Sequence, residues 1–176
     1  SFFQTNTRQA EKLYDIILEE SALTGSEIVY DLFCGTGSIS LYLSKHAKMV
    51  YGFELVTSAV QDAMQNAIHN KVKNAWFFGG NLENLFRENT EAKELEHPDV
   101  VVVDPPRAGL HTKTIEDIME KLPKRIVYVS CNPASQARDV ALLCNEKYEL
   151  KKLRPVDMFP HTPHVENVAT LIQKSK

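Results

Sequence analysis

The sequence is poor in cysteine: its 176 residues include only Cys34, Cys131 and Cys144, which stand far apart. There is no Cys-x-x-Cys pair, and no histidine lies at the spacing of a zinc finger. This pattern argues against a disulfide framework and against a structural zinc site. Such cysteine usage is typical of a protein of a reducing compartment, so we expect a cytoplasmic location.

Long apolar runs and an excess of positive charge are also lacking. No apolar segment approaches the roughly 18 residues of a membrane span, and the N-terminus lacks the basic and then apolar pattern of a signal peptide. The net charge of −3 and the isoelectric point near 6.1 argue against binding of nucleic acid mainly through a strong positive field. The basic residues of 121–125 and 147–154 can form a local patch, although solvated faces are the favoured interpretation.

The chain does contain a regular alternation of strand-like and helical patterns. A first helix is indicated by the spacing of Ala10, Leu13, Ile16 and Ile17 and should end near Gly25. Strand-like runs at 28–33, 49–53, 75–78, 100–103 and 126–129 are then separated by helical patterns at 38–45, 57–70, 81–87, 113–121 and 135–145. This alternation predicts parallel βαβ units.

The last two strand-like runs, 148–153 and 167–172, have no helix between them and should pair antiparallel. This order of elements predicts the α/β fold of class I methyltransferases that depend on S-adenosylmethionine. That Rossmann-like fold has a mixed seven-stranded sheet with helices on both faces. We expect residues 1–176 to form one domain of this kind.

A glycine-rich turn follows the first strand, where residues 31–40 read DLFCGTGSIS. Gly35 and Gly37 let the backbone pass close to a ligand, but the dinucleotide fingerprint would need a third glycine in place of Ser40. Glu54 closes the second strand about 20 residues later, where an acidic residue commonly binds ribose hydroxyls. These features predict an adenosine site, and they leave a nicotinamide cofactor and S-adenosylmethionine both open.

Chemically capable side chains follow the later strands. Asp104 and two prolines end the strand at 100–103 and form a rigid acceptor site suited to a planar base or an amino group. Cys131 ends the strand at 126–129 and is either a nucleophile at the sheet edge or a small buried side chain. His161, His164 and Glu166 cluster before the last strand. The two histidines lack a third ligand, so no metal site is predicted.

The segments FFQTN, DLFCGTGSISL, DPPRAGL, VSCNPAS and MFPHTPHVE follow one another along essentially the whole chain. Together they closely resemble the RNA uracil-5-methyltransferase family, which methylates carbon 5 of specific uridines in tRNA and ribosomal RNA. The pairing of SCNP with HTPHVE is highly specific for that family. The resemblance implies an RNA substrate and S-adenosylmethionine as the cofactor.

The resemblance also implies roles for individual residues. Cys131 matches the nucleophile that adds to carbon 6 of uracil, and Glu166 matches the base that removes the proton from carbon 5. Positions that match or neighbour the family's cofactor contacts are Gln4, Phe33, Gly35, Ser38, Glu54, Asn81 and Asp104. Arg107 stands where many base-amino methyltransferases have an aromatic residue, which disfavours methylation of an exocyclic nitrogen; its own role is not assigned by the resemblance.

Members of this family usually carry an N-terminal RNA-binding region, often a small β-barrel, and some hold an iron–sulfur cluster there. This chain has neither that region nor cluster-type cysteines, so we expect it to be the catalytic domain of a longer protein. The segment FFQTN resembles the ribosomal RNA branch, which favours 23S rRNA as substrate, with tRNA as the alternative.

Other functions explain the motifs less well. A nicotinamide-dependent oxidoreductase would need the third glycine, and it gives no role to Cys131 with Glu166. Enzymes that methylate carbon 5 of cytosine also use a cysteine, but in a different motif. A non-catalytic RNA-binding module with a relic cofactor pocket is disfavoured because Cys131, Glu166 and Asp104 are all intact.

Overall fold

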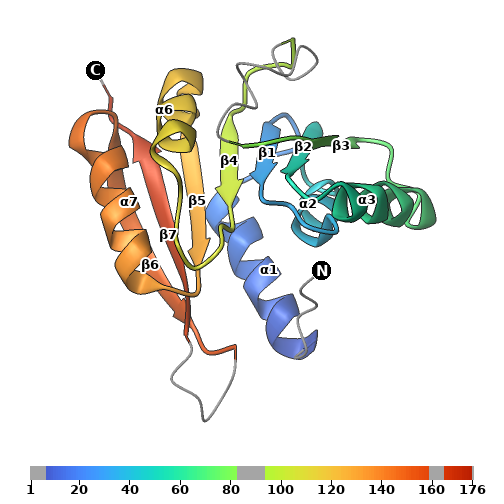
Figure 1. Ribbon diagram of the computed structural model, residues 1–176, viewed down its shortest axis with the longest axis horizontal. Helices are drawn as coiled ribbons and strands as arrows, with labels where there is room; N and C mark the ends of the chain where they lie inside the picture. The colour runs from blue at the N-terminus through green and yellow to red at the C-terminus, as the bar shows by residue number, and fades with distance from the viewer. Residues whose placement is uncertain (1–6, 83–93, 159–164, 176) are drawn as a thin grey trace.

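The fold is seen in a computed structural model that describes residues 7–82, 94–158 and 165–175 (Figure 1). Helices and strands alternate as α1 (Thr7–Ser21), β1 (Ile28–Leu32), α2 (Ser38–Leu43), β2 (Met49–Glu54), α3 (Thr57–His69), β3 (Ala75–Gly79), β4 (Val100–Val103), α6 (Thr112–Lys121), β5 (Arg125–Ser130), α7 (Pro133–Glu146), β6 (Tyr148–Val156) and β7 (Glu166–Gln173). The elements predicted from the sequence are confirmed to within a few residues. The helix predicted at 81–87 falls largely outside the described residues.

All of these strands form one seven-stranded sheet in the order β3-β2-β1-β4-β5-β7-β6. The strands from β1 to β5 pair in parallel, as expected for strands joined through helices. β7 runs antiparallel to both β5 and β6, since no helix separates β6 from β7. The predicted mixed sheet is therefore confirmed, and its strand order reverses between β1 and β4.

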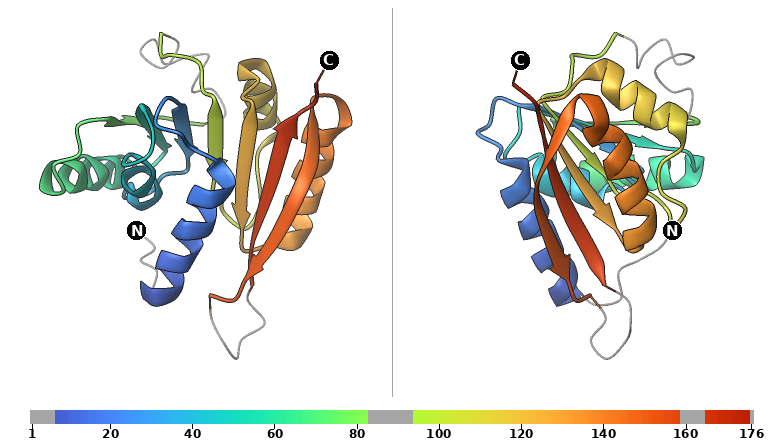
Figure 2. Two further views of the ribbon diagram at one scale, coloured as in Figure 1. Left: turned by 180° about the vertical axis from the view of Figure 1, so that it is seen from behind. Right: turned by 90° about the vertical axis from the view of Figure 1, so that its left-hand side faces the viewer.

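Helices cover both faces of this sheet. α1, α2 and α3 pack on one face, and α6 and α7 pack on the other (Figure 2). Side chains of β4 alternate between the two layers, because Val100 and Val102 pack with α1 while Val101 and Val103 pack with α6 and α7. Burial on both faces explains why the central strands read as continuous apolar runs.

Two basic residues of the C-terminal hairpin, Lys152 and Arg154, form ion pairs with α1. Glu20, which is 5% exposed, pairs with Lys152 at 2.7 Å and with Arg154 at 3.0 Å, and it also accepts a hydrogen bond from Thr170. Lys124 pairs with Asp99 in the same way at 2.8 Å. These basic side chains therefore help to hold elements of the fold together.

Candidate active site

The candidate residues lie along one edge of the sheet, in the order of the strands. Asn81 follows β3, Glu54 ends β2, Phe33 follows β1, Asp104 follows β4, Cys131 follows β5 and Glu166 begins β7. Parallel strands bring their carboxyl ends to the same edge, and the antiparallel β7 brings its amino end there. The reversal between β1 and β4 lies at the centre of this row, which is where open α/β sheets bind ligands.

One cavity follows this edge and has a volume of about 1470 Å³. That volume exceeds the roughly 300–1,000 Å³ of a typical small-molecule pocket, so the cavity has room for more than one ligand group. Its lining includes every candidate residue that the structure describes: Phe33, Gly35, Ser38, Glu54, Asn81, Asp104, Cys131 and Glu166. Gln4, His161 and His164 lie outside the described residues.

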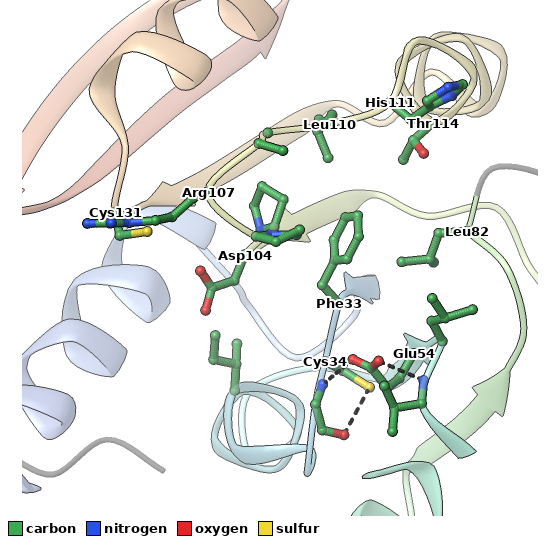
Figure 3. Close-up of a pocket in the computed structure, with 18 of the residues that line it drawn as sticks. Phe33, Cys34, Glu54, Leu82, Asp104, Arg107, Leu110, His111, Thr114 and Cys131 are labelled. Atoms are coloured by element: carbon green, nitrogen blue, oxygen red, sulfur yellow. Dashed lines mark hydrogen bonds between the residues drawn. The ribbon is translucent and has the colours of Figure 1, made fainter. Parts of the chain in front are cut away.

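The carboxylate of Glu54 lies at one end of the cavity. It accepts hydrogen bonds from the backbone N–H of Gly35 at 3.0 Å and of Val56 at 2.9 Å (Figure 3). A carboxylate oxygen has two lone pairs, so each oxygen keeps one for a ligand hydroxyl. Leu55 and Val56 are 61% and 53% exposed and also line the cavity. This end therefore offers fixed acceptors beside an apolar surface, which suits a nucleoside.

Phe33 occupies the middle of the cavity, where its ring points between Asp104 and Leu82 (Figure 3). Its backbone has a φ of 66°, although its N–H donates to the carbonyl oxygen of Phe53 at 2.9 Å. A positive φ is unfavourable for a bulky residue, and such strain persists mainly at functional sites. The turn after β1 therefore adopts an unfavourable backbone conformation at Phe33, and this conformation presents the aromatic ring to the cavity.

Asp104 lies near two other acids, the buried Asp31 and the half-buried Glu166. Burial raises the pKa of Asp104 to about 7, and the nearby carboxylates of Glu166 and Asp31 add to the rise. Burial raises the pKa of Asp31 to about 7 as well, although Ser40 donates to it at 2.6 Å. Within the described part of the chain, the Asp104 carboxylate accepts no hydrogen bond. A positively charged ligand group would offset the cost of ionising these acids.

Cys131 and Glu166 come together through the pairing of β5 with β7. The antiparallel register ends with Ser130 opposite Asn167, and one further step places Cys131 opposite Glu166. Burial raises the pKa of Glu166, while the guanidinium of Arg107 lowers it. A partly buried carboxylate of this kind suits a general base that must pick up a proton near neutral pH.

Arg107 and Cys131 both line the cavity (Figure 3). Its carbonyl oxygen accepts hydrogen bonds from Asn132 Nδ2 at 2.9 Å and from Ser135 Oγ at 3.1 Å. The loop after β4 is thereby attached to the turn that carries the cysteine. The structure thus places Arg107 near Glu166 and the turn that carries Cys131, where its sequence position had left it without a role.

A buried carboxylate that the sequence had not singled out holds the rest of this loop. Asp139 of α7 is fully buried and accepts hydrogen bonds from the Leu110 N–H at 2.7 Å and from the Tyr128 hydroxyl at 2.7 Å. Its other oxygen accepts from Arg138 Nε at 2.8 Å. The loop after β4, the strand β5 and the helix α7 are therefore joined at one side chain.

Gly109→Ala should destabilise the protein through this loop. Gly109 has a φ of +82°, and an added Cβ would lie 2.5 Å from Asp139 Oδ2. Gly25→Ala is the matched control, because Gly25 has a φ of +101° but nothing within 4 Å of an added Cβ. Backbone strain alone costs about 1–2 kcal/mol, so we expect a larger loss of unfolding free energy for Gly109→Ala in urea titrations. Equal losses for the two variants would contradict the clash.

The arrangement of an adenosine-type site beside a cysteine and a half-buried carboxylate agrees with the comparisons to known proteins. The family model described as tRNA (uracil-5-)-methyltransferase matches residues 1–174. The chain belongs to this family. The resemblance stated from the sequence motifs is thereby confirmed.

Close relatives of this uracil-5-methyltransferase family member occur in several bacteria. The chain is 50% identical over 171 residues to an RNA methyltransferase of Bacteroides thetaiotaomicron, covering 97% of this chain and 37% of the relative. It is 52% identical over 169 residues to an RNA methyltransferase of Staphylococcus aureus strain MSSA476, covering 96% of this chain and 37% of the relative. The chain thus spans little more than a third of the length of these curated relatives.

Solved structures agree with the family assignment and with the fold. The tRNA (uracil-54, C5)-methyltransferase of Pyrococcus abyssi, in complex with S-adenosyl-L-homocysteine, superimposes with a TM-score of 0.83 at 39% identity and covers 98% of this chain and 40% of that chain. An rRNA methylase of Streptococcus thermophilus gives a TM-score of 0.71 at 16% identity, covering 95% and 97%, which shows the fold alone. The predicted class I methyltransferase fold is confirmed, and S-adenosylmethionine is the cofactor that this family uses.

In the described ranges, no helix is long and apolar enough to cross a membrane. The same residues contain no group of three or more His, Cys, Asp or Glu side chains that could hold a metal ion.

Proposed function

We propose that residues 1–176 are the catalytic domain of an RNA (uracil-C5)-methyltransferase. The observation that carries this proposal is that Cys131 and Glu166, which flank the last paired residues Ser130 and Asn167 of β5 and β7, line the same cavity as Glu54. Methylation of uracil needs a nucleophile, because carbon 5 is too weakly nucleophilic to take a methyl group before carbon 6 is attacked. It also needs a base, because the proton on carbon 5 must then be removed.

The residues of the cavity fit S-adenosylmethionine. Glu54 has free acceptor positions for the ribose hydroxyls, and Leu55 and Val56 provide an apolar surface for the adenine. The acidic region around Asp104 suits the positive charges of the amino acid part, with the turn at Gly35 and Ser38 close by. Phe33 would cover the middle of the cofactor. When bound, the cofactor supplies an electrophilic methyl group.

Cys131 and Glu166 then act on the uracil ring in different steps. The thiolate of Cys131 forms a bond to carbon 6 of uracil, which shifts the electron pair of the 5,6 double bond onto carbon 5 and the carbonyl oxygen at carbon 4, as an enolate, and makes carbon 5 nucleophilic. After carbon 5 has gained the methyl group, Glu166 removes its proton. The electron pair left behind restores the double bond and expels the sulfur of Cys131. Arg107, which lowers the pKa of Glu166, favours the ionised base that this step requires.

The nature of the RNA is the finer part of the proposal. The segment FFQTN favours 23S rRNA, while the Pyrococcus abyssi neighbour acts on uracil 54 of tRNA. The relatives are much longer than this chain, so we propose that a separate region of the parent protein binds the RNA and helps to flip the target uridine into the cavity. Both RNA classes therefore belong in the test.

The test uses the full-length protein, S-adenosylmethionine and RNA that carries 5-fluorouridine. Fluorine at carbon 5 blocks the proton removal, so a methylated protein–RNA adduct should be trapped and detected by denaturing mass spectrometry. Separate reactions with rRNA and with tRNA, followed by nucleoside analysis, identify the substrate and distinguish 5-methyluridine from 5-methylcytidine. If neither RNA gives an adduct or 5-methyluridine, the proposed function is wrong.

Cofactor affinity should depend on pH through Asp104. The pKa of this carboxyl is about 7, so the group is neutral at lower pH and becomes negatively charged as the pH rises. Affinity for S-adenosylmethionine should therefore fall by up to about tenfold for each pH unit below 7, since one pKa unit corresponds to a factor of ten. Calorimetric titrations between about pH 5.5 and pH 8.5 measure this slope.

Asp104→Asn should flatten the profile, because it leaves no charge to titrate at this position. Asp31→Asn is the matched control: the pKa of Asp31 is also about 7, but Asp31 is not among the residues that line the cavity. The slope should survive in that variant. If the pH dependence is lost with Asp31→Asn and kept with Asp104→Asn, the titrating acid is Asp31, and the assignment to Asp104 is wrong.

A further inference from the structure

The side chain of Gln136 joins the two strands that carry the catalytic pair. Gln136 lies in the first turn of α7 and is 2% exposed. Its Nε2 donates to the carbonyl oxygen of Tyr128 in β5 at 2.9 Å and to the carbonyl oxygen of Asn167 in β7 at 3.0 Å. Its Oε1 accepts from Asn167 Nδ2 at 2.5 Å. One buried amide therefore connects a helix with two neighbouring strands.

These contacts fall directly beside the reacting groups. Asn167 is the neighbour of Glu166 in the chain, and it is the last residue of β7 that pairs with β5. On its other side, Asn167 lies opposite Pro155 of β6, which has no backbone N–H to offer. The side chain of Gln136 thus supplies a fixed donor at the point where the ladder ends and Glu166 begins.

The turn that carries Cys131 has other supports. Ser130 Oγ donates to the carbonyl oxygen of Asn132 at 3.0 Å and accepts from the Asn132 N–H at 3.0 Å. Asn132 caps α7 through the Ala134 N–H and also holds the loop at Arg107. None of these bonds involves the Gln136 side chain. Loss of that side chain should therefore move Glu166 more than Cys131.

We propose that Gln136 is a positioning residue that sets Glu166 against the carbon 5 proton of the bound uracil. Gln136 does not itself line the cavity, so it acts through Asn167 and the start of β7. The proposal rests on the proposed function. It predicts that Gln136 affects the last step of the reaction, in which Glu166 takes the proton and the bond between Cys131 and carbon 6 breaks. Attack by Cys131 and methyl transfer precede that step and should be largely unaffected.

The test compares the wild-type full-length protein with Gln136→Leu, which keeps a similar volume but removes all three hydrogen bonds. Displacement of a reacting group by about 1 Å can cost about 100-fold in rate, so turnover on normal RNA should fall about 10- to 100-fold. The methylated protein–RNA adduct should accumulate at the same time. Affinity for S-adenosylhomocysteine and the rate of adduct formation with 5-fluorouridine RNA should stay within about twofold of wild type.

Two further variants separate positioning from general stability. Gln136→Glu, when protonated in its buried site, still donates one hydrogen bond and accepts another, so it should recover much of the turnover. Gln136→Leu should have no additional effect in a Glu166→Gln background, because residues that act in one step are not additive. An ordinary structural role would add to the Glu166→Gln defect.

The possible failures are distinguishable. Unchanged turnover in Gln136→Leu, or loss of cofactor binding together with adduct formation, would overturn the positioning role while leaving the proposed function intact. If wild-type protein forms no adduct with 5-fluorouridine in either rRNA or tRNA, the proposed function itself fails.

Discussion

Cys131→Ala is expected to lower the rate of RNA methylation by about 10⁴-fold or more and to abolish the covalent protein–RNA adduct. The large effect follows from the chemistry of uracil, because no step after the attack on carbon 6 can proceed without the attacking sulfur. Removal of a covalent nucleophile has effects of this size or larger in other enzymes. Radiolabelled methyl transfer and denaturing gels of the RNA adduct measure the two outcomes.

Cys144→Ala is the matched control for this variant. Cys144 also lies partly buried on the segment from β5 through α7, but it is not among the residues that line the cavity. It should retain wild-type turnover and wild-type adduct formation. Cofactor affinity should be nearly unchanged in both variants. If Cys131→Ala still forms the adduct and Cys144→Ala does not, the nucleophile is Cys144, and the assignment to Cys131 is wrong.

Glu166→Gln is expected to stop the reaction one step later. The amide cannot accept the carbon 5 proton, so turnover should fall by about 10²- to 10⁴-fold, the usual contribution of a general base. Cys131 remains able to attack, and the methyl group is still transferred. The methylated adduct should therefore accumulate with ordinary uridine in the RNA, without any need for fluorine. Mass spectrometry under denaturing conditions detects its added mass.

Glu149→Gln is the matched control for Glu166→Gln. Glu149 is an exposed residue of the adjacent strand β6 and forms an ion pair with Lys151. Its replacement should leave turnover at the wild-type level and should cause no adduct to accumulate. If Glu166→Gln loses the adduct as completely as Cys131→Ala does, Glu166 is needed before methyl transfer, and its assignment as the final base is wrong.

The elements of the fold could be predicted closely because their hydrophobic periods are unambiguous. The valines of β4 and the apolar run of β5 are buried on both faces, which only the centre of a parallel sheet explains. The strand order could not be derived from these patterns, since every central strand looks alike in sequence. The likeness to the methyltransferase fold predicted only a mixed seven-stranded sheet, which the placement of β7 between β5 and β6 confirms.

The residues that line the cavity could be predicted where they belong to a sequence motif at a strand end. The buried polar residues that support the cavity could not. Cys131, Glu54 and Asp104 stand at strand ends, a position that sequence patterns reveal. By contrast, Gln136 and Asp139 lie among ordinary polar residues of α7, and nothing in their spacing shows that their side chains turn inward to hold a loop or a strand. The positive φ of Phe33 is hidden for the same reason, because backbone strain has no sequence signature outside glycine.

The strand order also defines a template for inhibitors. From the end of β2, where Glu54 lies, to the end of β5, where Cys131 lies, the sheet has three strand spacings, which is about 14 Å. A bisubstrate compound that joins an adenosine to a uracil mimic through a linker of this length would run along the row, crossing Phe33 and Asp104 on its way. A cationic centre in that linker, placed over Asp104, would favour this enzyme over proteins that bind only one of the two halves.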